Sequence, residues 1–113
     1  MIRGAVSRID LGDAKRGHEQ RGRRLGLMLS PTSMPWSVAT VIPTSTTAQP
    51  AVFRPTLHIH GQPTRLLVDQ IRGIDTTYIH GDPVDYLDRD ELAEVEHAVI
   101  RYLGLSQHPT LHT

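Results

Sequence analysis

The 113-residue chain has no cysteine, no long apolar run and few aromatic side chains. The missing thiols exclude disulfide bonds and thiolate zinc sites. No stretch reaches the roughly 18 apolar residues that cross a bilayer. Arg3 is followed by no apolar signal segment, so we expect a cytoplasmic protein that does not contact a membrane. The length suits a single domain, and aliphatic residues must form most of its core.

The chain also lacks net charge, but its charges are unevenly distributed. Residues 1–24 hold seven basic and three acidic side chains, whereas residues 82–103 hold seven acidic side chains against Arg89 and Arg101. The first segment can therefore present a cationic surface to a polyanion although the whole chain is not basic. Charge alone favours a simpler interpretation, namely two solvated faces of opposite sign.

The apolar pattern predicts several short strands and one helix. Strand-like segments cover 3–11, 25–30, 38–42, 51–59, 64–69, 70–75 and 84–87, with Pro43 ending the third, turns at 61–63 and 81–83, and a polar loop at 12–24. Asp88 with Glu91 forms a capping box, and Gly104 suits the position after a helix, so we predict a helix over 89–103. The chain is therefore mainly β, a bent antiparallel sheet or partial barrel with a C-terminal α-helix packed on it.

The densest group of chemically active side chains lies in the polar loop. It combines His18, Glu19, Gln20, Arg21, Arg23 and Arg24 between glycines. Guanidinium groups match phosphate oxygens, and a neighbouring carboxylate can accept a proton from a hydroxyl. On composition alone, a solvated loop with ordinary ion pairs remains the simpler interpretation.

A second group consists of hydroxyls just after a predicted strand, at Thr44, Ser45 and Thr46. Such hydroxyls bind a phosphate oxygen or merely form a turn. His58 and His60 share a strand face but have no matched third ligand, so we expect neither a metal site nor a cofactor. Together the two groups suggest metal-independent phosphodiester chemistry on RNA, whose 2′-OH is the nucleophile that DNA lacks.

Four segments in order then resemble one known family. They are RGAVSRIDLGDAKRGHEQRGRR, LMLSP, VIPTSTT and LLVDQIRGID, followed by the amphipathic helix. Over most of its length the chain resembles the MazF/PemK toxins of bacterial toxin–antitoxin systems. The resemblance implies an SH3-like small barrel over residues 1–105 with a disordered tail at 106–113. It also implies a homodimer that cuts single-stranded RNA at short sequences without metal, and an antitoxin that inhibits it through an acidic disordered C-terminal segment.

The resemblance also implies roles for individual residues. Arg24 takes the position of the arginine that stabilises the transition state, and Glu19 that of the proposed base. Ser45 takes the position of the catalytic threonine, with Thr44 or Thr46 as alternatives if the register slips by one. For RNA binding we expect Gln20 and Gln70, together with Arg16, His18, Arg21, Arg23 and Arg72. The chain departs from the family pattern at Ser7, Leu25 and Ser45.

Two other functions stay open on the sequence. One is a non-enzymatic inhibitor like the CcdB toxins, which bind DNA gyrase; it would act through the C-terminal helix and would not need Glu19 or Arg24. The other is a degenerate relative that only binds its antitoxin or RNA.

Overall fold

The computed structural model describes residues 2–12, 22–31 and 37–105. Its elements are β1 (Ala5–Asp10), β2 (Arg23–Met28), β3 (Val38–Ser45), β4 (Thr56–Ile59), β5 (Gln62–Leu66), the 3-10 turn η1 (Val68–Gln70), β6 (Arg72–Asp75), the 3-10 turn η2 (Thr76–Tyr78), β7 (Ile79–Tyr86) and α1 (Arg89–Leu103). The predicted mainly β architecture and the helix over 89–103 are both confirmed. The tail at 106–113 lies outside the described residues, and no described helix is both long and apolar enough to cross a bilayer.

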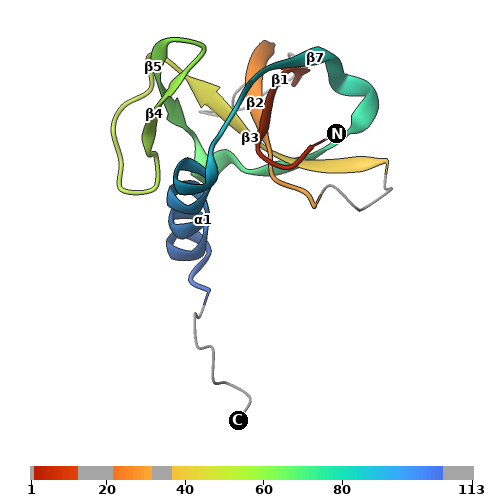
Figure 1. The fold of residues 1–113 in the computed structure, drawn as a ribbon. Helices are drawn as coiled ribbons and strands as arrows, with labels where there is room; N and C mark the ends of the chain where they lie inside the picture. Colours follow the sequence, from red (N-terminus) through yellow and green to blue (C-terminus); the bar gives the residue numbers. More distant parts are fainter. Residues whose placement is uncertain (1, 13–21, 32–36, 106–113) are drawn as a thin grey trace.

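The strands form one antiparallel sheet in the order β4-β5-β3-β2-β1-β7, with β6 paired to β3. Strand β3 pairs β6 along Val38–Val41 and then pairs β5 at Thr44 and Ser45. Because β3 changes partner halfway, the sheet divides there. Figure 1 shows β1, β2, β3 and β7 curling into a half-open barrel, while the β4–β5 hairpin turns away beside α1.

Two aliphatic clusters fill the two sides of this sheet. One cluster lies inside the barrel and includes Ile9, Met28 and Val41. The other includes Leu27 and Ile42 and packs against Val95 and Ala98 of α1. Since side chains alternate along a strand, each barrel strand contributes to both clusters. This arrangement accounts for a stable core with so few aromatic residues.

Helix α1 begins and ends as its sequence predicts. The Asp88 side chain accepts from the Glu91 backbone N–H at 2.8 Å, and the Glu91 side chain accepts from the Asp88 N–H at 2.9 Å. At the other end Gly104 adopts the left-handed conformation, with φ of 67°, which costs glycine little because it has no Cβ. Both predicted signals are therefore confirmed.

Pro43 does not end its strand, contrary to our prediction. It lies within β3, opposite Gly26, at the point where β3 leaves β6 and before it joins β5. A proline lacks the backbone donor that a strand partner needs, and this junction needs none. Its carbonyl still accepts a hydrogen bond from Leu67 N at 2.9 Å, so the strand continues to Ser45.

Other boundaries also differ from the predictions. Residues 81–83 lie inside β7 rather than in a turn, within the irregularity between His80, which pairs with Arg8 of β1, and Asp85, which pairs with Val6. The β4–β5 turn consists of His60 and Gly61, whose φ angles of 52° and 81° suit a two-residue hairpin. The predicted strand at 51–59 begins only at Thr56, because a turn closes from Arg54 N to Ala51 O.

Candidate active site

Arg24 lies at one end of the barrel, in strand β2 and not in a loop as predicted. Strand β2 starts at Arg23, and Arg24 pairs with Ile9 of β1. On its other side, β2 pairs with β3 through Gly26 and Pro43. Arg24 and Ser45 each lie two residues beyond that pair, on the two adjacent strands. The strands therefore carry the predicted guanidinium and hydroxyl toward the same end of the sheet.

The three candidate hydroxyls have different surroundings. Thr44 is buried, and its Oγ1 donates to the Leu25 carbonyl at 2.9 Å. Ser45 is only 6% exposed, and its Oγ accepts from the backbone N–H groups of Thr47 and Ala48 at 3.1 and 3.0 Å. Thr46 is exposed at the surface. The Thr44 hydroxyl therefore serves the β2–β3 connection, whereas Ser45 and Thr46 lie where the strand opens into the following loop.

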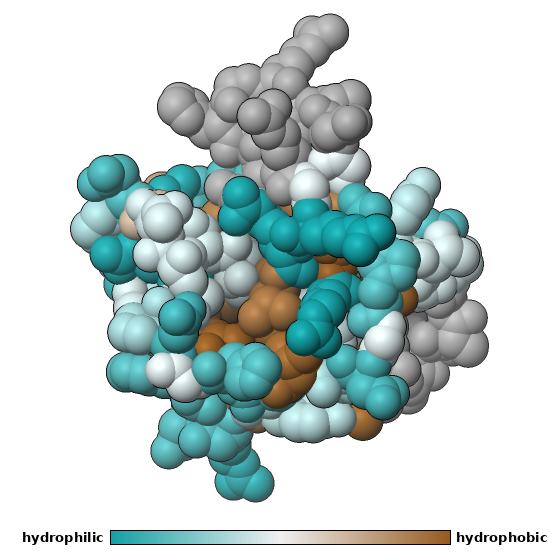
Figure 2. Space-filling view, turned by 90° about the horizontal axis from the view of Figure 1, so that it is seen from above, coloured by the Kyte–Doolittle hydropathy of each residue, from teal (hydrophilic) through white to brown (hydrophobic). Residues whose placement is uncertain are grey.

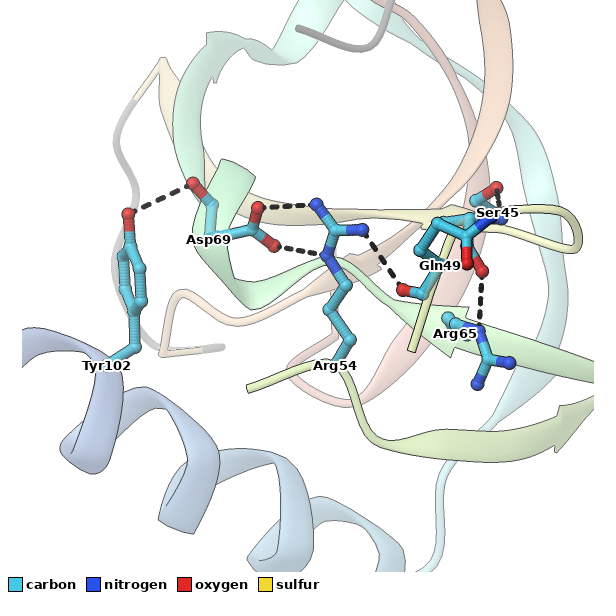
Figure 3. Close-up of polar contacts among 7 residues, drawn as sticks. Ser45, Gln49, Arg54, Arg65, Asp69 and Tyr102 are labelled. Carbon is cyan, nitrogen blue, oxygen red and sulfur yellow. Dashed lines mark hydrogen bonds and ion pairs between the residues drawn. The ribbon is translucent and has the colours of Figure 1, made fainter. Parts of the chain in front are cut away.

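Two arginines hold the loop that follows Ser45, and neither was singled out from the sequence. Arg54 donates to both carboxylate oxygens of Asp69, at 2.9 and 2.7 Å, and to the Gln49 carbonyl at 3.1 Å. Arg65 donates from Nε to the Ala48 carbonyl at 2.7 Å. Figure 3 shows these contacts running from Asp69 across Arg54 to the neighbourhood of Ser45. The backbone after the candidate hydroxyl is therefore fixed by side chains from β5 and from the segment before β4.

The Arg54–Asp69 ion pair is largely buried, and the contact between the two side chains shifts the pKa of each. Each side chain is 18% exposed. Hydrogen bonds from Arg54, helped by its charge, lower the pKa of Asp69 although burial opposes this, and the same contacts raise the pKa of Arg54. Tyr102 of α1 adds a hydrogen bond from its hydroxyl to the Asp69 carbonyl at 3.3 Å. The helix is thereby joined to the same cluster.

Gln70 and Arg72, two predicted RNA-binding residues, follow Asp69 directly. Gln70 ends η1 and Arg72 begins β6. Arg72 pairs with Val41 and lines a hollow that it shares with Asp10 and Asp75. The Thr77 backbone N–H, together with its hydroxyl, lowers the pKa of the exposed Asp75. Arg72 therefore has carboxylates near it, and its surroundings are less cationic than those of Arg24.

The remaining predicted site residues lie outside the described residues: Arg16, His18, Glu19, Gln20 and Arg21. The described chain on either side of them is held together. Leu11 N donates to the Gly22 carbonyl at 2.9 Å, and Gly22 N donates to the Gly12 carbonyl. Gly12 and Gly22, the described residues on either side, are therefore held together next to the start of β2, the strand that carries Arg24.

A cationic depression also opens beside Arg24. It has a volume of about 550 Å³ and is lined by Arg8, Ile9, Arg23, Arg24, Leu25 and His80. Figure 2 shows a face of the molecule on which hydrophilic side chains surround and partly cross an apolar hollow. Neither Arg8 nor His80 was singled out from the sequence. No three metal-ligating side chains lie together in the parts of the chain that the structure describes.

These features define the class of protein. A half-open, mainly β barrel with a C-terminal helix and arginines at one end is the architecture expected of the plasmid-maintenance toxins. Residues 2–103 match the family of PemK-like, MazF-like toxins of type II toxin–antitoxin systems. The chain belongs to this family.

Individual relatives agree with that assignment. A candidate toxin of Mycobacterium tuberculosis is 72% identical over 105 residues, which cover 93% of this chain and 99% of that protein. The structure of MazF from Deinococcus radiodurans superposes with a TM-score of 0.79 at 28% identity, covering 93% of this chain and 97% of that one. An endoribonuclease in complex with its cognate antitoxin, from a mycobacterial species, has a TM-score of 0.77 at 18% identity, over 96% and 99% of the two chains. At this identity the last likeness concerns the fold alone.

Proposed function

We propose that the chain is a cytoplasmic endoribonuclease toxin that cuts single-stranded RNA by attack of the 2′-OH on the adjacent phosphate. The observation that carries the proposal is that Arg24 and Ser45 lie on the adjacent strands β2 and β3, each two residues beyond the Gly26–Pro43 pair. Membership of the PemK-like, MazF-like family supports it. So does the similarity in fold to a protein described as an endoribonuclease.

The chemistry needs three contributions from the protein. The 2′-oxygen bonds to phosphorus as it loses its proton, and the bond from phosphorus to the 5′-oxygen breaks as that oxygen gains one. Glu19 is the proposed acceptor of the first proton, and Arg24 is the proposed donor of the proton that the leaving 5′-oxygen gains. Arg24 donates to the phosphate oxygens, where negative charge grows in the transition state, and such donors contribute most when they are fixed beforehand. No metal is required for this route, because the permanent charge of Arg24 stabilises the pentacoordinate phosphate.

Ser45 and Thr46 offer different hydroxyls to that phosphate. The Ser45 Oγ atom accepts hydrogen bonds from two backbone N–H groups, which occupy its lone pairs. The Ser45 hydroxyl can therefore act only as a hydrogen-bond donor, and its proton can point to a phosphate oxygen. Its other polar neighbour is Thr47 Oγ1, at 3.4 Å, too far for a strong bond. We therefore assign Ser45 as a donor and not as a base, with the exposed Thr46 as the alternative. Gln70 and Arg72, together with Arg16, His18, Gln20, Arg21 and Arg23, would bind the flanking nucleotides.

We also propose two protein partners. The first is a second copy of the chain, bound at a mostly apolar groove between β3 and α1, where Leu29, Val38, Val99 and Ile100 lie beside the Arg3–Glu96 ion pair. Val38 is 51% exposed although it is apolar, which suits a covered surface. The second is a cognate antitoxin with an acidic disordered segment, as the cationic barrel end would attract it. Sedimentation of the purified chain tests the first partner; a monomer at micromolar concentration would contradict it.

Cleavage of a fluorescent single-stranded RNA in excess EDTA tests the activity. We expect the wild-type chain to cut and Arg24→Ala to lose about 100-fold or more in rate, the usual cost of one transition-state donor. Arg101→Ala, on the exposed face of α1, is the matched control and should cut normally. Comparing Ser45→Ala with Thr46→Ala identifies the active hydroxyl.

Folding of each variant is checked by circular dichroism. A folded Arg24→Ala protein that cuts at the wild-type rate would refute the assignment. Inhibition of gyrase supercoiling with RNA left intact would favour a CcdB-like inhibitor instead.

A further inference from the structure

Arg8, Arg23 and His80 lie on one face of the sheet, next to the proposed reaction centre but outside it. The register pairs Arg8 with Leu25 on β2 and with His80 on β7. Arg23 is two residues before Leu25 and therefore shares its face. Leu25, Arg8 and His80 thus form a row across the adjacent strands β2, β1 and β7, with Arg23 beside Leu25 on β2. The three polar side chains are exposed, and together with Leu25, Ile9 and Arg24 they line the depression of about 550 Å³.

Two of the arginines that line the depression, Arg8 and Arg23, carry charges without an ion pair among the described residues. The nearest carboxylate along the register is Asp10, opposite Arg23. Asp10 lines a different hollow, and its Oδ1 accepts from the Gly12 backbone N–H at 2.9 Å. Two permanent charges and an imidazole donor therefore face one opening.

The floor of the depression has the opposite character. Leu25 is partly buried and packs against the core cluster under α1. Sites for single-stranded nucleic acid combine positive charge along the backbone with apolar or planar groups that contact bases, and the arginine plane itself stacks on a base. An acidic peptide would use the charges but has no base or sugar face to place on the floor. The combination thus favours a nucleotide.

We propose that this depression binds the phosphate and the nucleotide next to the scissile bond, with Arg8 and His80 as phosphate-binding residues beside Arg23. The inference rests on the proposed ribonuclease function, because Arg24 lines the depression and is also the proposed transition-state donor. RNA whose scissile phosphate lies at Arg24 must continue past it in both directions. The depression gives one of those directions a cationic path.

The test compares Arg8→Gln with the wild-type chain in binding to an RNA that carries 2′-deoxyribose at the cleaved nucleotide, so that it stays intact. We expect Arg8→Gln to weaken binding about tenfold at ~0.1 M salt, the effect of losing one charge-assisted contact. The slope of log Kd against log salt should fall by about 0.7, the value for one phosphate contact on a single strand. Arg101→Gln, an exposed arginine on α1, is the matched control and should change neither quantity.

A second measurement locates the contact. Neutral methylphosphonate linkages are placed one at a time on either side of the scissile position. At one position the neutral linkage should weaken wild-type binding and abolish the difference between wild type and Arg8→Gln. His80→Gln should also bind the unmodified RNA more weakly than wild type, and this difference in binding should disappear when the neutral linkage is at the same position.

The outcomes separate this inference from the proposed function. If the wild-type chain cuts RNA but Arg8→Gln keeps its Kd and salt slope, the inference is refuted and the ribonuclease stands. If the wild-type chain does not cut, the proposed function fails, and a changed slope in Arg8→Gln still supports a nucleotide site. If Arg8→Gln binds RNA normally but loses affinity for a glutamate-rich peptide, the depression is a protein site and the inference is wrong.

Discussion

Replacing Asp69 with asparagine should destabilise the fold, and the burial of Asp69 and its contacts determine by how much. The substitution keeps the shape but removes the charge that receives two hydrogen bonds from Arg54. Exposed ion pairs contribute up to about 1 kcal/mol, whereas breaking a fully buried pair costs about 3–5 kcal/mol. With 18% of each side chain exposed, we expect an intermediate loss of about 2 kcal/mol, or about 8 °C in Tm for a chain of this length.

The loss should depend on pH in a defined direction. Because the contacts with Arg54 lower the pKa of Asp69 in the folded state, its contribution is complete above the pKa of an unfolded aspartate, about 3.9. It disappears as the pH falls through the lower folded value. Urea unfolding at pH 7 should therefore show the full difference between wild type and Asp69→Asn, and the two curves should approach each other below about pH 4.

The matched control is Asp82→Asn, an exposed carboxylate in β7, which should change stability by less than about 0.5 kcal/mol. A double-mutant cycle with Arg54→Gln measures the pairwise coupling directly. Equal unfolding midpoints for wild type and Asp69→Asn at pH 7, or a difference that grows as the pH falls, would refute the reasoning.

Two further substitutions test the fold at other points. Asp88→Ala removes the acceptor for Glu91 N and should cost about 1 kcal/mol in urea unfolding, the usual cost of an N-cap; an unchanged midpoint would show that the capping box does not stabilise α1. Gly26→Ala would place a Cβ 2.5 Å from Ile9 Cδ1 in the barrel core, so we expect a loss of about 1–3 kcal/mol by thermal unfolding. A variant as stable as wild type would mean that Ile9 repacks freely.

The sequence predicts local structure well where the signal is local. The boundaries of α1 follow from Asp88, Glu91 and Gly104, all of which act within one turn of the helix. The prediction at Pro43 was wrong because a proline is accepted inside β3 only where that strand changes its pairing from β6 to β5. That change involves three strands that are distant in sequence. The turn expected at 81–83 is instead an irregularity within β7, because the residues on either side of it, His80 and Asp85, pair with the distant strand β1.

The residues of the candidate site also fall into two groups: those that the sequence indicates and those that only the fold brings together. Arg24 and Ser45 were chosen by resemblance, and the register then places them on adjacent strands. Nothing near Arg54 or Asp69 in the sequence marks them as a pair, because 15 residues separate them and their contact depends on η1 packing beside β3. Arg8 and His80 are 72 residues apart and meet only through the pairing of β1 with β7.

The Arg54–Asp69 pair also connects stability to the proposed activity. On one side Arg54 holds the Gln49 carbonyl, in the loop that Ser45 begins. On the other side Asp69 directly precedes Gln70. The pair therefore braces two segments of the proposed site against each other, and Tyr102 ties α1 to the same point. Catalytic groups act only when held close to their productive geometry, so Asp69→Asn should slow RNA cleavage even at temperatures where the variant remains folded. Asp82→Asn should not, because Asp82 lies in β7, outside this brace.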